Sequence, residues 1–116
     1  MQQRITVIVY PVSDIDGAKK LFTQFLGVEP YVDSPYYVGY RIGDQEVGLD
    51  PNGRKQGLSG PIAYTDVSDI RQSLQALLDA GAQELQPVRD VAQGLLVATV
   101  KDVDGNVIGL RQAPQK

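Results

Sequence analysis

Apolar and polar residues alternate along this chain in a way that predicts short strands separated by two helices. Residues 4–10 are rich in β-branched side chains, which favours a strand covered on both faces. The next segment has helical spacing, with Ser13 as the expected N-cap and Gly27 as a left-handed C-cap. Its apolar residues are expected to form one buried stripe, made of Ile15, Ala18, Leu21, Phe22, Phe25 and Leu26.

The remaining elements follow from the same patterns. Three strands are expected after the first helix, at residues 28–32, 35–42 and 46–50. A polar, glycine-rich stretch at residues 51–60 is typical of a linker. A strand at 61–65, a helix that ends at Gly81, and strands at about 84–88, 95–101 and 107–112 complete the chain. The dipeptide Asp104-Gly105 predicts a tight turn before the last strand.

The two halves share sequence as well as pattern. Val67-Ser68-Asp69-Ile70 repeats the letters of residues 12–15, 55 residues later, and Gly109-Leu110 repeats residues 48–49, 61 residues later. Repeats of this size are usually supersecondary units that bury their apolar faces together. We therefore predict one α+β domain with two βαβββ modules, residues 1–57 and 58–116.

Composition excludes several classes of partner. The net charge is −3, and basic residues occur only in isolated pairs such as Lys19-Lys20, which argues against nucleic acid. The chain has no cysteine, no apolar run near the ~20 residues that span a bilayer, and no secretion signal at its start. We expect a cytoplasmic protein that makes no contact with membranes.

The order of these motifs resembles the vicinal oxygen chelate superfamily of glyoxalases, bleomycin-resistance proteins and extradiol dioxygenases. The resemblance implies paired half-barrel sheets with helices outside, a cleft between the sheets, and a homodimer. The residues that carry it extend over the whole chain: Val12-Ser13-Asp14-Ile15, Leu26-Gly27, Gly60-Pro61-Ile62-Ala63-Tyr64, Ala80-Gly81-Ala82 and Asp104-Gly105-Asn106-Val107-Ile108-Gly109-Leu110.

Metal-using members of that superfamily take one ligand, usually histidine, from the first strand of each module and a glutamate from the last strand. The matching positions in this chain are Val7, Gly48, Ile62 and Gly109. A register slip by one residue at Ile62 would place Pro61 or Ala63 there instead. None of these side chains has a lone pair to donate, and the chain has no histidine. We therefore expect a cleft with no metal and no cofactor, which binds a small molecule.

Strand alternation selects candidate residues for that cleft. Side chains two positions apart share a face, which selects Asp50 and Arg111 beside the two glycines and Tyr64 beside Ile62. The repeat's approximate symmetry would bring Asp50 and Arg111 near each other. Three crowded tyrosines complete the set: Tyr36 and Tyr40, expected on one face of a strand, and Tyr37 on the other.

Three functions remain open at this point. The favoured one is metal-independent binding of a small molecule, with sequestration of a drug or metabolite as a possible purpose. The first alternative is a metal-independent lyase or isomerase that uses a tyrosine or a carboxylate, such as Asp50 or Glu46, as acid or base. The second alternative is a non-catalytic module that pairs with another protein through its sheet faces.

Overall fold

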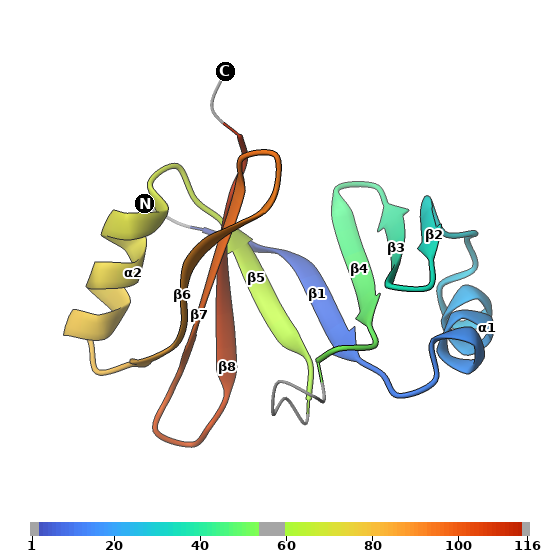
Figure 1. Cartoon of the computed structure of the whole chain (residues 1–116), viewed down its shortest axis with the longest axis horizontal. Coiled ribbons are helices and arrows are strands. Elements are labelled where there is room, and N and C mark those ends of the chain that lie inside the picture. The colour runs from blue at the N-terminus through green and yellow to red at the C-terminus, as the bar shows by residue number, and fades with distance from the viewer. Residues whose placement is uncertain (1–2, 54–59, 115–116) are drawn as a thin grey trace. The chain divides into compact units, whose positions relative to one another are not determined.

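The computed structural model describes residues 3–53 and 60–114 (Figure 1). The chain divides into two units: one spans Thr6–Ile62, and the other is formed by the rest of the chain. The predicted boundary at residue 57, and most of the predicted linker, lie outside the described residues.

The first module has the predicted order of elements. It consists of β1 (Ile5–Pro11), α1 (Ile15–Leu26), β2 (Val32–Ser34), β3 (Tyr37–Ile42) and β4 (Gln45–Asp50). Its strands lie in the order β2-β3-β4-β1. β1 is parallel to β4, and the other neighbours are antiparallel.

The second module repeats this topology. It consists of β5 (Ile62–Asp66), α2 (Ile70–Asp79), β6 (Gln83–Ala92), β7 (Leu95–Lys101) and β8 (Val107–Gln112). The strands lie in the order β6-β7-β8-β5, with β5 parallel to β8 and the others antiparallel. The predicted pair of βαβββ modules is therefore confirmed.

Each module buries one face of its sheet under its own helix (Figure 1). In the first module the buried side chains are Val38, Tyr40, Val47 and Leu49, packed against α1. In the second they are Val67, Ile70, Leu74, Ala98, Val100 and Leu110. Because side chains alternate along a strand, the intervening residues form the opposite face, which we call the helix-free face. It carries Val7, Val9, Tyr37, Gly39, Arg41, Glu46 and Gly48 in the first module, and Ile62, Tyr64, Val97, Thr99, Gly109 and Arg111 in the second.

The helix ends differ slightly from the prediction. The N-cap of α1 is Asp14, not Ser13, because the Asp14 carboxylate accepts a hydrogen bond from the Gly17 amide. Gly27 is the left-handed C-cap, as predicted, with φ of 73°. In α2 the C-cap is Ala80, and Gly81 follows it with φ of 112°.

The predicted buried stripe of α1 was partly wrong. Ile15, Phe22 and Leu26 pack against the sheet, as does Ala18. Leu21 and Phe25 are instead 66% and 71% exposed, because the helix turns this side away from the strands. The apolar residues spaced three and four apart cover a wider part of the helix surface than the part that contacts the sheet.

Two strands and one turn complete the comparison. The second strand lies at Val32–Ser34 rather than 28–32, and β6 continues to Ala92, with three register shifts in its pairing with β7. The predicted turn is confirmed: Asp102 accepts hydrogen bonds from the amides of Asp104 and Asn106, and Gly105 has φ of 87°. The Asn106 side-chain amide also donates to Asp102 Oδ2 at 2.9 Å, and this bond, together with the backbone bonds, holds the pKa of the Asp102 carboxyl below its ordinary value.

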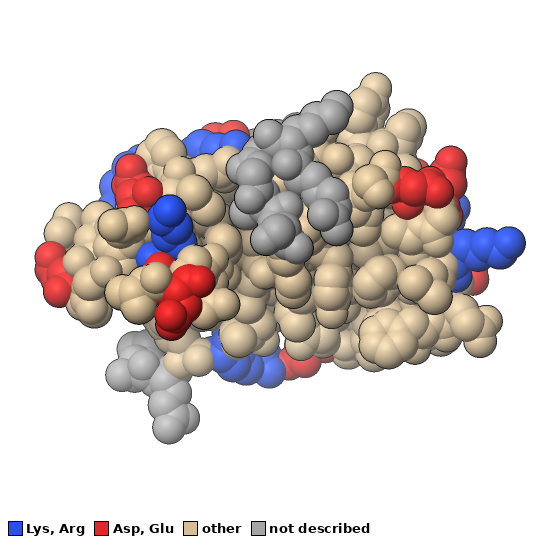
Figure 2. Space-filling model, turned by 90° about the horizontal axis from the view of Figure 1, so that it is seen from below, with Lys and Arg blue, Asp and Glu red and all other residues tan. Residues whose placement is uncertain are grey.

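Charge is scattered over the surface that Figure 2 shows. Acidic and basic side chains occur there singly or in mixed groups rather than as a broad patch of one sign. No helix in the described ranges has the length and apolar character needed to cross a bilayer.

Candidate functional site

The position of the expected glutamate in the first module is occupied by a tyrosine from a neighbouring strand. Gly48 lies in the middle of β4, on the helix-free face, and pairs with Gly39 of β3. The Tyr37 side chain lies over Gly48, so that a Cβ atom there would stand 2.6 Å from Tyr37 Cζ. Any side chain at position 48 would therefore collide with this ring.

The second module has the same arrangement at Gly109. Tyr64 of β5 pairs with Gly109 of β8, and its ring covers the glycine. A Cβ atom at position 109 would stand 2.8 Å from Tyr64 Cγ. In both modules, glycine is required because an aromatic ring rests on the backbone.

The two tyrosines come from non-equivalent strands. Tyr64 lies on the first strand of its module, where the first module has Val9. Tyr37 lies on the third strand of its module, where the second module has Val97. Each module thus places one tyrosine and one valine around its central glycine, with the two residue types exchanged between strands.

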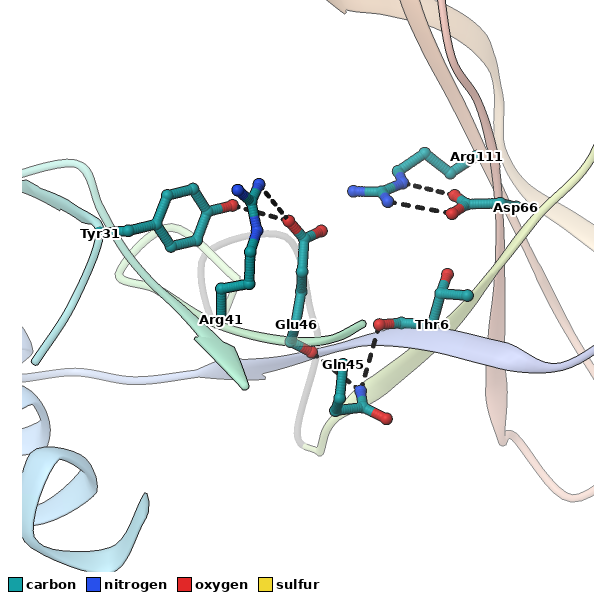
Figure 3. A network of polar contacts seen from close by, with 7 residues as sticks. All are labelled: Thr6, Tyr31, Arg41, Gln45, Glu46, Asp66 and Arg111. Carbon is teal, nitrogen blue, oxygen red and sulfur yellow. Dashed lines mark hydrogen bonds and ion pairs between the residues drawn. The ribbon is translucent and has the colours of Figure 1, made fainter. Parts of the chain in front are cut away.

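Tyr31, Arg41 and Glu46 form a polar network on the first module (Figure 3). The Tyr31 hydroxyl donates to Glu46 Oε1 at 2.8 Å, and Arg41 Nη2 donates to the same oxygen at 3.0 Å. The Arg41 guanidinium lies 4.2 Å from the centre of the Tyr31 ring, within the range of a cation–π contact. Partial burial and the bond to Glu46 raise the pKa of the Tyr31 phenol, which keeps its hydroxyl protonated as the hydrogen-bond donor to Glu46.

The predicted charged residues have local partners. Arg111 forms a two-point ion pair with Asp66, through Nε at 2.6 Å and Nη2 at 3.1 Å (Figure 3). An Asp50 oxygen accepts the amide of Asn52, which closes the turn after β4. Arg111 and Tyr64 lie on one helix-free face, as the alternation rule predicts.

Two of the predicted tyrosines lie elsewhere. Tyr36 is in the turn between β2 and β3 rather than in a strand, and its side chain is 75% exposed. Tyr40 is fully buried under α1, and its hydroxyl donates to the Lys19 carbonyl and contacts the Thr23 hydroxyl. The expectation that Tyr36 and Tyr40 share a strand face was wrong because the strand begins only at Tyr37. We leave both out of the candidate site.

The candidate site also contains residues outside the predicted ligand-binding set. Tyr31 and Arg41 contact Glu46, which was predicted only as a candidate acid or base, and Asp66 is the partner of Arg111. Glu46 lies two residues before Gly48, so alternation places it on the same strand face as Asp50, two residues after. The contact between Tyr31 and Glu46 has no signal in the sequence. Tyr31 precedes β2 and Glu46 lies on β4, so the contact depends on how β3 pairs with both strands.

Two surface hollows flank α1 in the described structure, away from these residues. One, of about 410 Å³, is lined by Asp16, Lys19, Lys20, Thr23 and Glu29. The other, of about 230 Å³, is lined by Tyr10, Leu21, Phe22 and Phe25. Both are open and shallow, and none of the predicted site residues lines either one.

The residues at the four expected ligand positions do not fit a metal ion. Val7 and Ile62 offer only hydrocarbon, and the two glycines are covered by tyrosine rings. In the described parts of the chain, no three acidic, histidine or cysteine side chains gather in a metal-binding group. We therefore derive no chemistry through a metal.

Comparison with known proteins identifies the family. A structure of a hypothetical protein from Bacillus halodurans C-125 matches with a TM-score of 0.76 at 16% identity, covering 100% of this chain and 98% of that one. A glyoxalase/bleomycin resistance protein/dioxygenase superfamily member from Vibrio splendidus 12B01 matches with a TM-score of 0.71 at 20% identity, covering 96% of this chain and 98% of that one. Methylmalonyl-CoA epimerase from Mycobacterium tuberculosis matches with a TM-score of 0.67 at 16% identity, covering 97% and 88%.

These similarities establish the fold, and a family model establishes membership. No curated protein sequence matches the chain. The model of the Glyoxalase/Bleomycin resistance protein/Dioxygenase superfamily matches residues 4–110, almost the whole sequence. The chain therefore belongs to the glyoxalase/bleomycin resistance protein/dioxygenase superfamily.

Proposed function

We propose that this protein binds a small molecule without a metal ion, using the tyrosine-bearing helix-free faces of its modules. One observation carries the proposal: at both positions where metal-using members of the family have a glutamate ligand, this chain has a glycine covered by a tyrosine ring. A tyrosine there offers an apolar surface and a polar hydroxyl, which suits an organic ligand and not a metal. Sequestration by a homodimer is part of the same proposal, on the resemblance to drug-binding members of the superfamily.

The alternative, a metal-independent lyase or isomerase, stays a prediction. Its candidate bases were Asp50 and Glu46. The Asp50 carboxylate accepts a hydrogen bond from the Asn52 amide, and the Glu46 carboxylate accepts hydrogen bonds from Tyr31 and Arg41. Both carboxylates thus have a structural role in these bonds, and we assign no reaction to them.

The binding proposal is tested by screening cationic and neutral aromatic drugs and metabolites in buffer that contains EDTA, by thermal shift and then calorimetry. We expect binding that persists in EDTA. Because an aromatic contact contributes about 0.5–1.5 kcal/mol, Tyr64→Leu or Tyr37→Leu should weaken it by roughly three- to tenfold. Tyr36→Leu is the matched control, since Tyr36 lies in an exposed turn, and it should leave the affinity unchanged.

Two results would count against the proposal. One is a screen in which every hit disappears when EDTA is added. The other is a hit whose affinity is the same in the wild type and in both tyrosine variants.

A further inference from the structure

The Tyr31–Arg41–Glu46 network, named here the cation seat, combines an aromatic face with a carboxylate. A positive group over the Tyr31 ring is attracted by the π electrons, and a carboxylate at its edge accepts its N–H bonds. In this structure the positive group is the chain's own Arg41, 4.2 Å from the ring centre and 3.0 Å from Glu46 Oε1. The ring and the carboxylate are thus arranged as a binding site for a planar cation, and the Arg41 guanidinium occupies that site.

The residues of the cation seat differ in exposure. The Glu46 side chain is only 17% exposed, and its Oε1 accepts a hydrogen bond from the Tyr31 hydroxyl at 2.8 Å. Tyr31 is 50% exposed and the Arg41 side chain 57%. The carboxylate is therefore the buried part of the seat, while the Tyr31 ring and the Arg41 guanidinium are both accessible from the solvent.

The cation seat adjoins the tyrosine that covers Gly48. A Cβ atom at Gly39 would lie 3.3 Å from Tyr31 Cε1 and 3.2 Å from Tyr37 Cε2, so both rings border the same glycine. The seat thus continues the face on which we have proposed ligand binding. The Arg111–Asp66 ion pair on the second module differs from the Arg41–Glu46 pair. Arg111 donates two hydrogen bonds, one to each oxygen of the Asp66 carboxylate.

We propose that the cation seat recognises a small organic molecule with a guanidinium or amidinium group, and that Arg41 is an internal competitor for it. The ligand's planar cation replaces the Arg41 guanidinium over Tyr31 and bonds to Glu46. The rest of the ligand extends toward Tyr37. This inference rests on the proposed function, since it names the ligand class for the same sheet face.

Calorimetric titration of two matched probes tests the inference. Benzylguanidinium carries the planar cation, and benzylurea is its neutral counterpart of the same shape. In Arg41→Gln the internal competitor is gone, and benzylguanidinium should bind about three- to tenfold more tightly than to the wild type. Benzylurea should show no such gain. In the double variant Arg41→Gln/Glu46→Gln, the gain for benzylguanidinium should disappear.

Lys19→Gln is the control for charge alone. It removes one positive charge from the same module and separates Asp33 from its lysine partner. It should leave the affinity for benzylguanidinium unchanged. An equal gain in Lys19→Gln, an equal gain for benzylurea, or no binding of benzylguanidinium to Arg41→Gln would overturn the inference.

The two proposals fail in different ways. If EDTA-resistant hits still depend on Tyr37 or Tyr64 while the probe titrations show no preference for the cation, the inference is wrong and the proposed function stands. If the screen finds no such hits and neither probe binds to any variant, the proposed function is wrong, and the inference that rests on it is wrong as well.

Discussion

Replacing Gly109 by alanine is expected to lower the free energy of unfolding by about 1–3 kcal/mol, the usual effect of inserting a methyl group into a packed region. The new Cβ atom would stand 2.8 Å from Tyr64 Cγ, and closer still to other atoms of the ring. The ring cannot stay in place, because these are atoms near the base of the side chain. Urea denaturation of the two proteins measures the difference.

The cause of that loss can be isolated with two further variants. Gly60→Ala is the matched control, because among the described residues no atom beyond its chain neighbours lies within 4 Å of the added Cβ, and stability should be unchanged. In a Tyr64→Ala background the collision is absent, so Gly109→Ala should cost much less than in the wild type. An equal cost in both backgrounds would show that Tyr64 is not the obstacle.

Tyr40→Ala is expected to destabilise the protein by about 3–5 kcal/mol, the range for truncating a large buried aromatic side chain. Tyr40 has no exposed surface and is among the largest fully buried side chains described. Tyr40→Phe should cost about 1 kcal/mol, because it removes only the hydroxyl that bonds to the Lys19 carbonyl. Denaturant unfolding separates the two effects.

Tyr36→Ala serves as the surface comparison for Tyr40. Its side chain is 75% exposed, and substitutions of this kind usually change stability by less than about 0.5 kcal/mol. If Tyr40→Ala proved as mild as Tyr36→Ala, Tyr40 would not be a core residue. Its place as a ligand contact would then have to be reconsidered.

The fold was predictable because its signals are local and repeated. The cap residues, the apolar spacing and the final Gly-Leu occur in both halves, and each fixes one element of a βαβββ module. The errors arose where tertiary packing decides. Leu21 has helical spacing like its neighbours, but whether it is buried depends on how the helix lies on the sheet.

The candidate site was predictable in part, for a related reason. Strand alternation from Gly109 found Arg111 and, from Ile62, found Tyr64. It failed for Tyr40, because alternation separates the two faces of the strand but does not say which of them α1 covers. The covering of Gly48 by Tyr37 depends on a diagonal contact between strands, which periodicity in one strand does not encode.

The central claim is that tyrosine rings stand where the family's metal chemistry would need a glutamate. Calorimetric titration of the purified, EDTA-treated protein with Zn²⁺, Ni²⁺ and Fe²⁺ tests it most directly. We predict no saturable binding, because Val7, Gly48, Ile62 and Gly109 offer no donor and the chain has no histidine or cysteine. Saturable binding of one ion per chain, weakened by substitution of Tyr37 or Tyr64, would contradict the account.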